Sequence, residues 1–268
     1  MLMTTLVAIG DFDPPYFAYY EDAAVAGTAK AHKLLEEAIE IDGPFDGIVG
    51  FSQGAGLALS YLLHHRITNP EAPPPFKFAL FFSTSFVLSP DPAYKEKEIM
   101  AVLRNFTPED VKTFLEIAVN PSSRQKDIEN GTFMKNLDQE ERDLFKELGW
   151  QACSLFQTRT QLQITDKFDF FEKLKTLELP PEAFPRFFNT IYTTQRLDIP
   201  TIHCFGRNDL DCNKRLALIG RELCAGGNVV TLEHTGRHEL PMRKEDVTAV
   251  ANAVEKAFFI GQQQVVVV

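Results

Sequence analysis

The sequence contains a serine in a setting typical of a catalytic nucleophile. Ser52 is the middle residue of Gly50-Phe51-Ser52-Gln53-Gly54, which matches the pattern G-x-S-x-G. The β-branched residues Ile48 and Val49 precede it, and a helical pattern from Ala55 to His65 follows. In a strand–turn–helix of this kind, glycines let the two backbones pass closely while the serine hydroxyl stays exposed. The segment therefore predicts nucleophilic attack by Ser52.

The helix that follows Ser52 would also stabilise a developing oxyanion. Its first N–H groups point toward the serine and carry a partial positive charge. The N–H of Gln53, directly after the serine, is the expected donor. The loop Ile9-Gly10-Asp11, after a predicted first strand, is a candidate source of a second donor.

A serine hydroxyl is a weak nucleophile and needs an imidazole base, which in turn needs a carboxylate partner. Asp209 lies in the turn after the apolar segment Thr201–Phe205, and His238 lies in the loop after a predicted strand over 228–232. In parallel sheets, the residues that do chemistry gather beyond the carboxyl ends of the strands. We therefore predict that Ser52, Asp209 and His238 form a catalytic triad.

The choice of histidine has an alternative in His234, four residues before His238. We favour His238 because Gly236 and Pro241 shape a tight loop around it, whereas His234 lies nearer the strand end. His203 lies within a predicted strand and is expected to be a buried, hydrogen-bonded core residue.

The choice of carboxylate has an alternative in Asp211. We favour Asp209 because it follows Gly206 in the turn after the strand, whereas Asp211 would cap the next helix. Both acids stay open on the sequence alone.

Strand and helix patterns alternate on both sides of these residues. The apolar run Lys77–Ser83 is typical of a strand buried on both faces of a parallel sheet. Apolar spacing predicts an amphipathic helix over Lys30–Ile39, with Leu34 on its buried face and His32 at the surface. The remaining predicted elements are strands at 5–9, 201–205 and 228–232 and helices at 213–223 and 244–259. This order predicts an α/β fold with a mostly parallel sheet flanked by helices.

Residues 89–195 contain no apolar run typical of a strand and favour helices. One helix is predicted to start at Thr107, and two others to cover Leu137–Leu148 and Phe170–Leu177. Eleven of the 23 phenylalanines lie in this stretch. We predict one domain over 1–268 with a helical lid insertion at 89–195. Its aromatic side chains either line an apolar substrate channel or form the insertion's own core.

Composition excludes several classes of function. A net charge of −10 over 268 residues argues against a nucleic-acid partner. No apolar run is long enough to span a membrane, and the first residues do not resemble a signal peptide. The four cysteines lack the spacing of a zinc site and are expected to be reduced thiols. We therefore predict a cytoplasmic protein without metal or cofactor.

The segment Gly43-Pro44-Phe45-Asp46-Gly47 through Ala55 resembles the serine elbow of the FSH family of serine hydrolases, which is widespread in fungi. Ile199–Asp209 resembles the family's acid loop, and His234-x-Gly236-x-His238-x-x-Pro241 resembles its histidine loop. The resemblance implies an α/β-hydrolase fold and catalytic roles for Ser52, Asp209 and His238. It also implies esterase or polyketide-releasing thioesterase activity, and thus a role in fungal secondary metabolism.

The chain departs from the family pattern in two places. Arg237 stands where the family has a glycine in its histidine loop. The family's N-terminal His-Gly loop, which helps to build the oxyanion hole, has no counterpart among the 51 residues before Ser52. This predicts shortened N-terminal strands, and losing one oxyanion donor typically costs about 10²–10³ in turnover.

The lead hypothesis is a hydrolase that cleaves a small-molecule ester or acyl thioester, including one bound to a carrier protein, through an acyl-Ser52 intermediate. The alternative is a catalytically impaired relative that binds an apolar ligand or partner in the same cleft. Acyl transfer to an alcohol or amine instead of water is a third option.

Overall fold

The protein was analysed as a computed structural model, which describes residues 4–6, 16–20, 23–104, 138–144, 146–147 and 184–265. The chain forms two compact units. The first contains Met1–Ala29 and Pro90–Arg186, and the second contains Lys30–Ser89 and Phe187–Val268. The second unit holds Ser52, Asp209 and His238, together with the strands that precede them.

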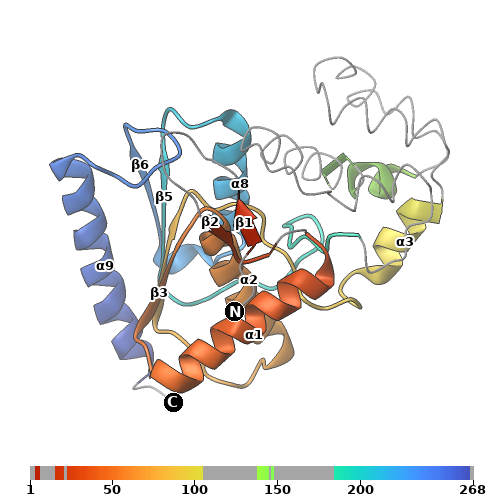
Figure 1. The fold of residues 1–268 in the computed structure, drawn as a ribbon, viewed down its shortest axis with the longest axis horizontal. Coiled ribbons are helices and arrows are strands. Elements are labelled where there is room, and N and C mark those ends of the chain that lie inside the picture. Colours follow the sequence, from red (N-terminus) through yellow and green to blue (C-terminus); the bar gives the residue numbers. More distant parts are fainter. Residues whose placement is uncertain are drawn as a thin grey trace. The chain divides into compact units, whose positions relative to one another are not determined.

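A parallel sheet forms the centre of the second unit. Its strands are adjacent in the order β3 (Gly47–Phe51), β4 (Phe78–Phe82), β5 (Thr201–Gly206) and β6 (Val229–His234) (Figure 1). The register pairs Phe51 with Phe82 and Phe82 with Cys204. The carboxyl ends of all four strands therefore meet at one edge, where loops far apart in sequence come together.

Helices cover both faces of this sheet. In Figure 1, α9 (Lys244–Val265) lies on one face, and α2 (Gln53–Thr68) and α8 (Asp211–Glu222) lie on the other. The 3₁₀ turn η3 (Gly226–Asn228) leads into β6. This arrangement confirms the α/β-hydrolase fold that the sequence predicted.

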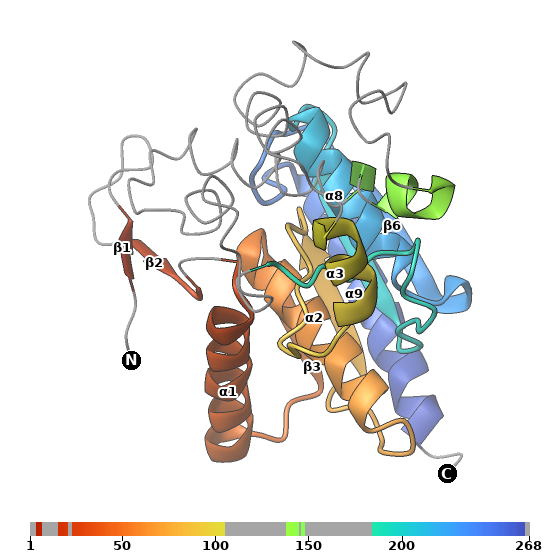
Figure 2. The ribbon, with the colours of Figure 1, turned by 90° about the vertical axis from the view of Figure 1, so that its right-hand side faces the viewer.

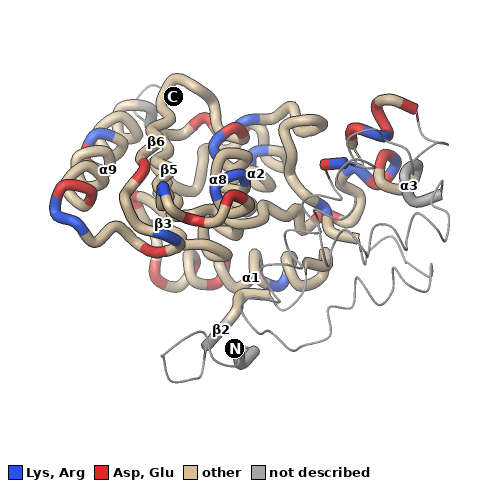
Figure 3. The backbone as a smooth tube through the Cα atoms, turned by 90° about the horizontal axis from the view of Figure 1, so that it is seen from above, with Lys and Arg blue, Asp and Glu red and all other residues tan. Residues whose placement is uncertain are grey.

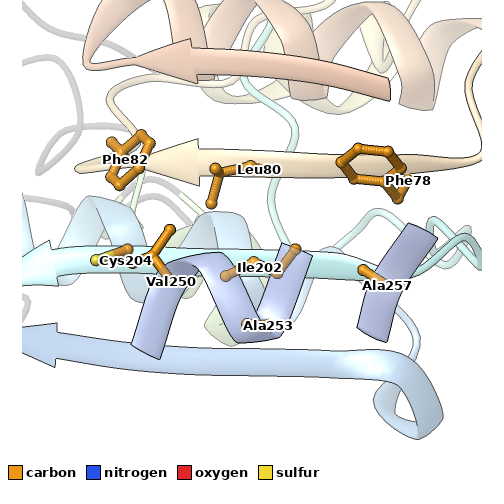
Figure 4. Packing of buried hydrophobic residues seen from close by; sticks show 8 residues of the cluster. All are labelled: Phe78, Leu80, Phe82, Ile202, Cys204, Val250, Ala253 and Ala257. Atoms are coloured by element: carbon orange, nitrogen blue, oxygen red, sulfur yellow. The ribbon is translucent and has the colours of Figure 1, made fainter. Parts of the chain in front are cut away.

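The core between α9 and the sheet shows why these segments form their elements. Alternate residues of two strands point toward α9 (Figure 4): Phe78, Leu80 and Phe82 of β4, and Ile202 and Cys204 of β5. Small residues such as Ala253 and Ala257, one turn apart on α9, let the helix approach the strands closely. Burial of this apolar surface, at roughly 25 cal/mol per Å², is the main force that holds helix to sheet.

The helix α1 (Val25–Asp42) is longer than predicted, and its buried face is different. From Lys30 onward it packs beside α2 (Figure 2), and the Nε2 atom of His32 lies 2.7 Å from the Oγ atom of Ser60. The surface position predicted for His32 is therefore wrong: it is only 4% exposed, whereas Leu34 is 37% exposed. The serine on α2 supplies a polar partner that the apolar spacing of α1 could not reveal.

The first unit contains a small antiparallel ladder of β1 (Thr4–Leu6) and β2 (Tyr16–Ala18), and the helix α3 (Glu96–Arg104). Residues 139–144 and 146–147 are helical, within the helix predicted over Leu137–Leu148. The predicted helices from Thr107 and over Phe170–Leu177 lie outside the described residues, as do most of the lid's phenylalanines. The lid at 89–195 stays a prediction.

In the part of the chain that the structure describes, no helix is both long and apolar enough to cross a membrane. Acidic and basic side chains follow one another along α8 and α9 (Figure 3). On α8, Lys214 pairs with Asp211 at 2.9 Å.

Candidate active site

Ser52 occupies a sharp turn between β3 and α2, as the motif predicts. Its backbone is in the left-handed region, with φ 52° and ψ −116°, which is unfavourable for a residue other than glycine. A Cβ atom on Gly50 would lie 2.5 Å from the carbonyl oxygen of Gly54 and 2.6 Å from the nitrogen of Ala55. Only glycine therefore lets β3 and α2 pass each other this closely.

Hydrogen bonds hold the strained turn in place. The N–H of Ser52 donates to the carbonyl of Phe82 at 2.9 Å, which extends the ladder between β3 and β4 by one residue. The carbonyl of Ser52 accepts from the N–H groups of Gly56 at 3.0 Å and Ser85 at 3.2 Å. These contacts fix the backbone so that the side chain leaves it in a defined direction.

The structure brings Ser52, His238 and Asp209 into one line of hydrogen bonds. The Nε2 atom of His238 lies 2.9 Å from the Oγ atom of Ser52, and its Nδ1 atom lies 2.8 Å from the Oδ2 atom of Asp209. Because an ionised carboxylate only accepts, Nδ1 carries the proton and Nε2 is the acceptor for the serine hydroxyl. This is the tautomer that a base needs in order to take a proton from serine.

The carboxylate of Asp209 is buried, with 2% of its side chain exposed, and hydrogen-bonded at both oxygens. Its Oδ1 atom accepts from the N–H of Leu210 at 2.7 Å and from Nδ2 of Asn213 at 2.8 Å. Burial raises the pKa of Asp209, but the hydrogen bonds from His238, Asn213 and Leu210 outweigh it and bring the pKa below its ordinary value. The group is therefore ionised at neutral pH, as the partner of an imidazolium must be.

The loops that carry Asp209 and His238 are joined to each other. Backbone N–H groups of Arg207 and Asn208 donate to the carbonyls of His234 at 2.8 Å and Gly236 at 3.0 Å. The side-chain amide of Asn208 adds a bond of 2.6 Å to the carbonyl of Thr235. The acid loop and the histidine loop therefore form one hydrogen-bonded body.

The alternative residues considered from the sequence lie elsewhere. His234 is buried, and its Nδ1 atom accepts from the N–H of Gly236 at 3.1 Å. Asp211 is fully exposed in the first turn of α8 and pairs with Lys214. Asp211 is the first helical residue and does not cap the helix as predicted, because Leu210 occupies the N-cap position.

His203 is buried as predicted, with 1% of its surface exposed, but it is not hydrogen-bonded as predicted. Neither ring nitrogen has a hydrogen-bond partner among the described residues. Its ring lies 5.1 Å from that of Phe81, and burial lowers its pKa to about 3. The imidazole is therefore neutral and packs as a flat, largely apolar group.

Gln53 is the first residue of α2, as the oxyanion prediction requires. N–H groups of a first helical turn point out of the helix end, where an anion is favoured. The loop Ile9-Gly10-Asp11, the candidate second donor, lies outside the described residues. Within the described ranges, no group of three or more His, Cys, Asp or Glu side chains is arranged to hold a metal ion.

Two neighbours of the site were missed in the sequence. Asn213 donates to Asp209, and the ring of Phe51 lies 5.2 Å from the ring of His238. The signal for Asn213 was its position four residues after Asp209, one helical turn away. The sequence pattern predicts a helix that begins at Asn213, whereas α8 begins at Asp211 and Asn213 lies in its first turn.

Arg237, which departs from the family pattern, is exposed and leaves the histidine loop in contact with the acid loop. A Cβ atom on Gly206 would lie 2.0 Å from the carbonyl oxygen of Arg237. The two loops therefore touch through backbone atoms at this point, which any residue at 237 provides.

Known proteins resemble this chain over most of its length. A model of the serine hydrolase (FSH1) family matches residues 10–250, a range that includes Ser52, Asp209 and His238. The chain is similar to esterase alnB of Emericella nidulans, with 31% identity over 93% of this chain and 80% of that protein. It is also 41% identical to hydrolase FUB4 of Fusarium oxysporum over 26% of each chain. An α/β hydrolase from Sphaerobacter thermophilus aligns with a TM-score of 0.35 at 15% identity, over 95% of this chain and 79% of that one.

Proposed function

This chain belongs to the serine hydrolase (FSH1) family and is a hydrolase, and we propose that it cleaves a carboxyl ester or thioester of an apolar acyl group through an acyl-Ser52 intermediate. The main support is the continuous line of hydrogen bonds from Ser52 through His238 to Asp209. A serine in this setting is activated for attack on an acyl carbon.

The proposed reaction has two halves. In the first, Nε2 of His238 takes the proton of Ser52 while Oγ bonds to the acyl carbon, and Asp209 stabilises the resulting imidazolium. The tetrahedral intermediate then collapses, and the leaving alcohol or thiol takes the proton from His238. In the second half, His238 takes a proton from water, the hydroxide attacks the acyl-serine, and the proton returns to Ser52 as the acid leaves.

We assign the N–H of Gln53 as an oxyanion donor, because it begins α2 directly after the nucleophile. The partial positive charge of the helix end would stabilise the negative oxygen of both tetrahedral intermediates. In a site with little water, a donor of this kind raises kcat about 10²- to 10³-fold.

The preference for an apolar acyl group is supported by exposed apolar side chains that neighbour the triad residues in the sequence. Phe51 precedes the nucleophile, is 40% exposed and packs against the ring of His238. Leu210 follows Asp209 and is 49% exposed, and Leu240 lies two residues after His238 and is 47% exposed. Exposed apolar side chains beside polar reacting groups are typical of pockets for apolar ligands.

We also propose a role in fungal secondary metabolism, with a carrier-bound thioester as one form of the substrate. Its support is the elbow sequence from Gly43 to Ala55, which resembles that of the family's fungal members, and the fungal source of the relatives described above.

The experiment is hydrolysis of p-nitrophenyl esters of increasing chain length, and of the matching acyl thioesters of N-acetylcysteamine. The variants are Ser52→Ala and, as a control, Thr248→Ala, which removes an exposed hydroxyl on α9. We expect Ser52→Ala to lose about 10³-fold or more in kcat. Thr248→Ala should keep the wild-type rate.

Labelling by a fluorophosphonate probe gives a second measurement, because the probe reacts only with an activated serine. Wild type should be labelled at Ser52 and Ser52→Ala should not. Equal hydrolysis by wild type and Ser52→Ala, with neither protein labelled, would reject the proposal. If Ser52 is labelled in the wild type, the ratio of ester to thioester turnover decides between the two substrate classes.

A further inference from the structure

The amide of Asn213 is directed at Oδ1 of Asp209, the carboxylate oxygen that is not hydrogen-bonded to His238. Asn213 lies in the first turn of α8, four residues after Asp209, and its Nδ2 atom is 2.8 Å from Oδ1. The amide is half-buried, and the carboxylate that it contacts is almost completely buried. A hydrogen bond to a charged group is stronger than one between neutral groups, most of all where the charged group is buried.

We infer that Asn213 is a positioning residue, which holds the Asp209 carboxylate in the plane that directs Oδ2 toward His238. This inference rests on the catalytic roles proposed above for Ser52, His238 and Asp209. Asn213 contacts neither Oγ of Ser52 nor Nε2 of His238 in this arrangement, and it acts through Asp209 and the Nδ1 side of the His238 ring.

The two oxygens of Asp209 have different partners, and this difference orients the group. Oδ1 accepts from the Leu210 N–H and the Asn213 amide, and Oδ2 accepts from Nδ1 of His238. Rotation about the terminal bond of an aspartate is only weakly restricted by its own geometry. Two donors at Oδ1, one from the backbone and one from α8, supply the missing restriction.

The chemistry of the amide suits this position. An asparagine donates a hydrogen bond without adding a charge, so it stabilises the carboxylate and does not repel the imidazolium that forms during the reaction. A lysine or arginine here would compete with His238 for the carboxylate. Nδ2 of Asn213 also lies 3.3 Å from Nδ1 of His238, where it limits movement of the ring toward α8.

The test compares Asn213→Leu and Asn213→Asp with the same two substitutions at Asn252, which is exposed on α9. Leucine removes the donor at similar volume, and aspartate keeps the shape but places a second carboxylate beside Asp209. The readouts are kcat and KM for p-nitrophenyl butyrate, the pH profile of kcat/KM, the rate of fluorophosphonate labelling and thermal unfolding.

For Asn213→Leu we expect kcat and the labelling rate to fall about 10-fold, with KM unchanged, because the base is less well oriented while the substrate contacts remain. Asn213→Asp should lose more. Its acid limb of kcat/KM should also move to higher pH, because an added negative charge favours the protonated imidazole of His238. The other charged groups near the two loops stay the same in all variants: Arg207, Asp211, Lys214, Glu233, Arg237 and Glu239.

A wild-type kcat and pH profile in both Asn213 variants would overturn the inference. So would losses no larger than the fraction of unfolded protein, which would mean that Asn213 only stabilises the start of α8. If Asn213→Leu does not fold, the isosteric Asn213→Asp decides the question by its pH profile. A wild type that neither hydrolyses ester nor takes up the probe would instead reject the proposed function.

Discussion

The serine elbow and the pair of loops that carry Asp209 and His238 reach the same site by different physical means. At the elbow, Ser52 is placed by sterics: glycine is required at position 50, and the serine backbone is held at a positive φ. The acid and histidine loops are placed by hydrogen bonds that join positions almost 30 residues apart, such as the amide of Asn208 and the carbonyl of Thr235. The elbow is therefore local and rigid, whereas the position of the other two side chains depends on how two loops dock.

Substitutions in the elbow and in the loop pair should affect different properties of the protein. An added methyl group at position 50 would meet the backbone of Gly54 and Ala55, which cannot move away as a side chain can, so it should affect folding. A change in the loop pair can be absorbed by movement of the histidine loop, so it should affect the rate before it affects the fold.

The largest effect is expected for Gly50→Ala. The new Cβ atom would lie 2.5–2.6 Å from backbone atoms of Gly54 and Ala55, closer than real contacts allow. We expect a loss of about 3 kcal/mol or more in the free energy of unfolding, measured in urea, and loss of activity with it. Gly226→Ala is the matched control, because nothing lies within 4 Å of its Cβ position. A Gly50→Ala protein as stable as this control would show that the elbow is not sterically determined.

Gly206→Ala should be next, with the opposite balance between rate and stability. Its Cβ atom would lie 2.0 Å from the carbonyl oxygen of Arg237, in the loop that carries His238. We expect kcat/KM to fall about 10²-fold as the imidazole is displaced. The free energy of unfolding should fall by about 1–3 kcal/mol. Gly227→Ala is the control here, and a Gly206→Ala enzyme with full activity would contradict the docked-loop description.

Acid should weaken the core beneath both regions. His32 supports the elbow helix α2, and His203 lies on β5, which leads into the acid loop. Burial lowers the pKa of each to about 3. The unfolded state takes up protons below about pH 6.5 while the folded state does not, so the stability is complete above that pH and is lost progressively toward pH 3. Each histidine should contribute about 1.4 kcal/mol per pH unit to this loss.

His203→Leu separates the two contributions. Because the ring nitrogens of His203 lack hydrogen-bond partners among the described residues, leucine should be tolerated at pH 7. The slope of the free energy of unfolding between pH 6.5 and 5 should then fall by about 1.4 kcal/mol per pH unit. An unchanged slope, measured by urea unfolding at a series of pH values, would mean that His203 does not titrate in this way.

Asn208→Ala should have a smaller effect than Gly50→Ala, Gly206→Ala or His203→Leu. It removes the side-chain bond to the carbonyl of Thr235 but leaves the backbone bond from Asn208 to Gly236. We expect a loss of about 1 kcal/mol in stability and a few-fold decrease in kcat. Asn252→Ala, at an exposed position on α9, is the control. A decrease in kcat as large as that of Gly206→Ala would show that the side chain, and not the backbone, holds the loops together.

The same contrast explains which parts of the fold and the site could be predicted. The sequence predicts Ser52 in its strand–turn–helix because the steric constraint lies within a few residues, and the glycines at positions 50 and 54 reveal it. The carboxylate and the imidazole were narrowed to Asp209 or Asp211 and to His238 or His234, since neighbours along the chain share one loop. Which member of each pair approaches Ser52 depends on hydrogen bonds between loops, which leave no local pattern.

The errors in the predicted elements have a related cause. The burial of His32 follows from its contact with Ser60 on another helix, and Asn213 was missed because α8 begins two residues earlier than its apolar pattern suggests. Polar contacts between distant segments are specific to the tertiary structure, whereas apolar periodicity reports only that a face is buried.

The sequence alone determined the four strands of the parallel sheet, the helices α2, α8 and α9 beside them, and the turn that holds Ser52, because apolar runs and a glycine-flanked turn are local properties. It also limited the acid and the base to two loops that follow strands. Only the tertiary structure decided that Asp209 and His238 meet at Ser52, that Asn213 supports the carboxylate and that His203 has no polar partner among the described residues. The physical reason is that parallel strands bring loops distant in sequence to one edge of the sheet, where short-range hydrogen bonds select among the candidates.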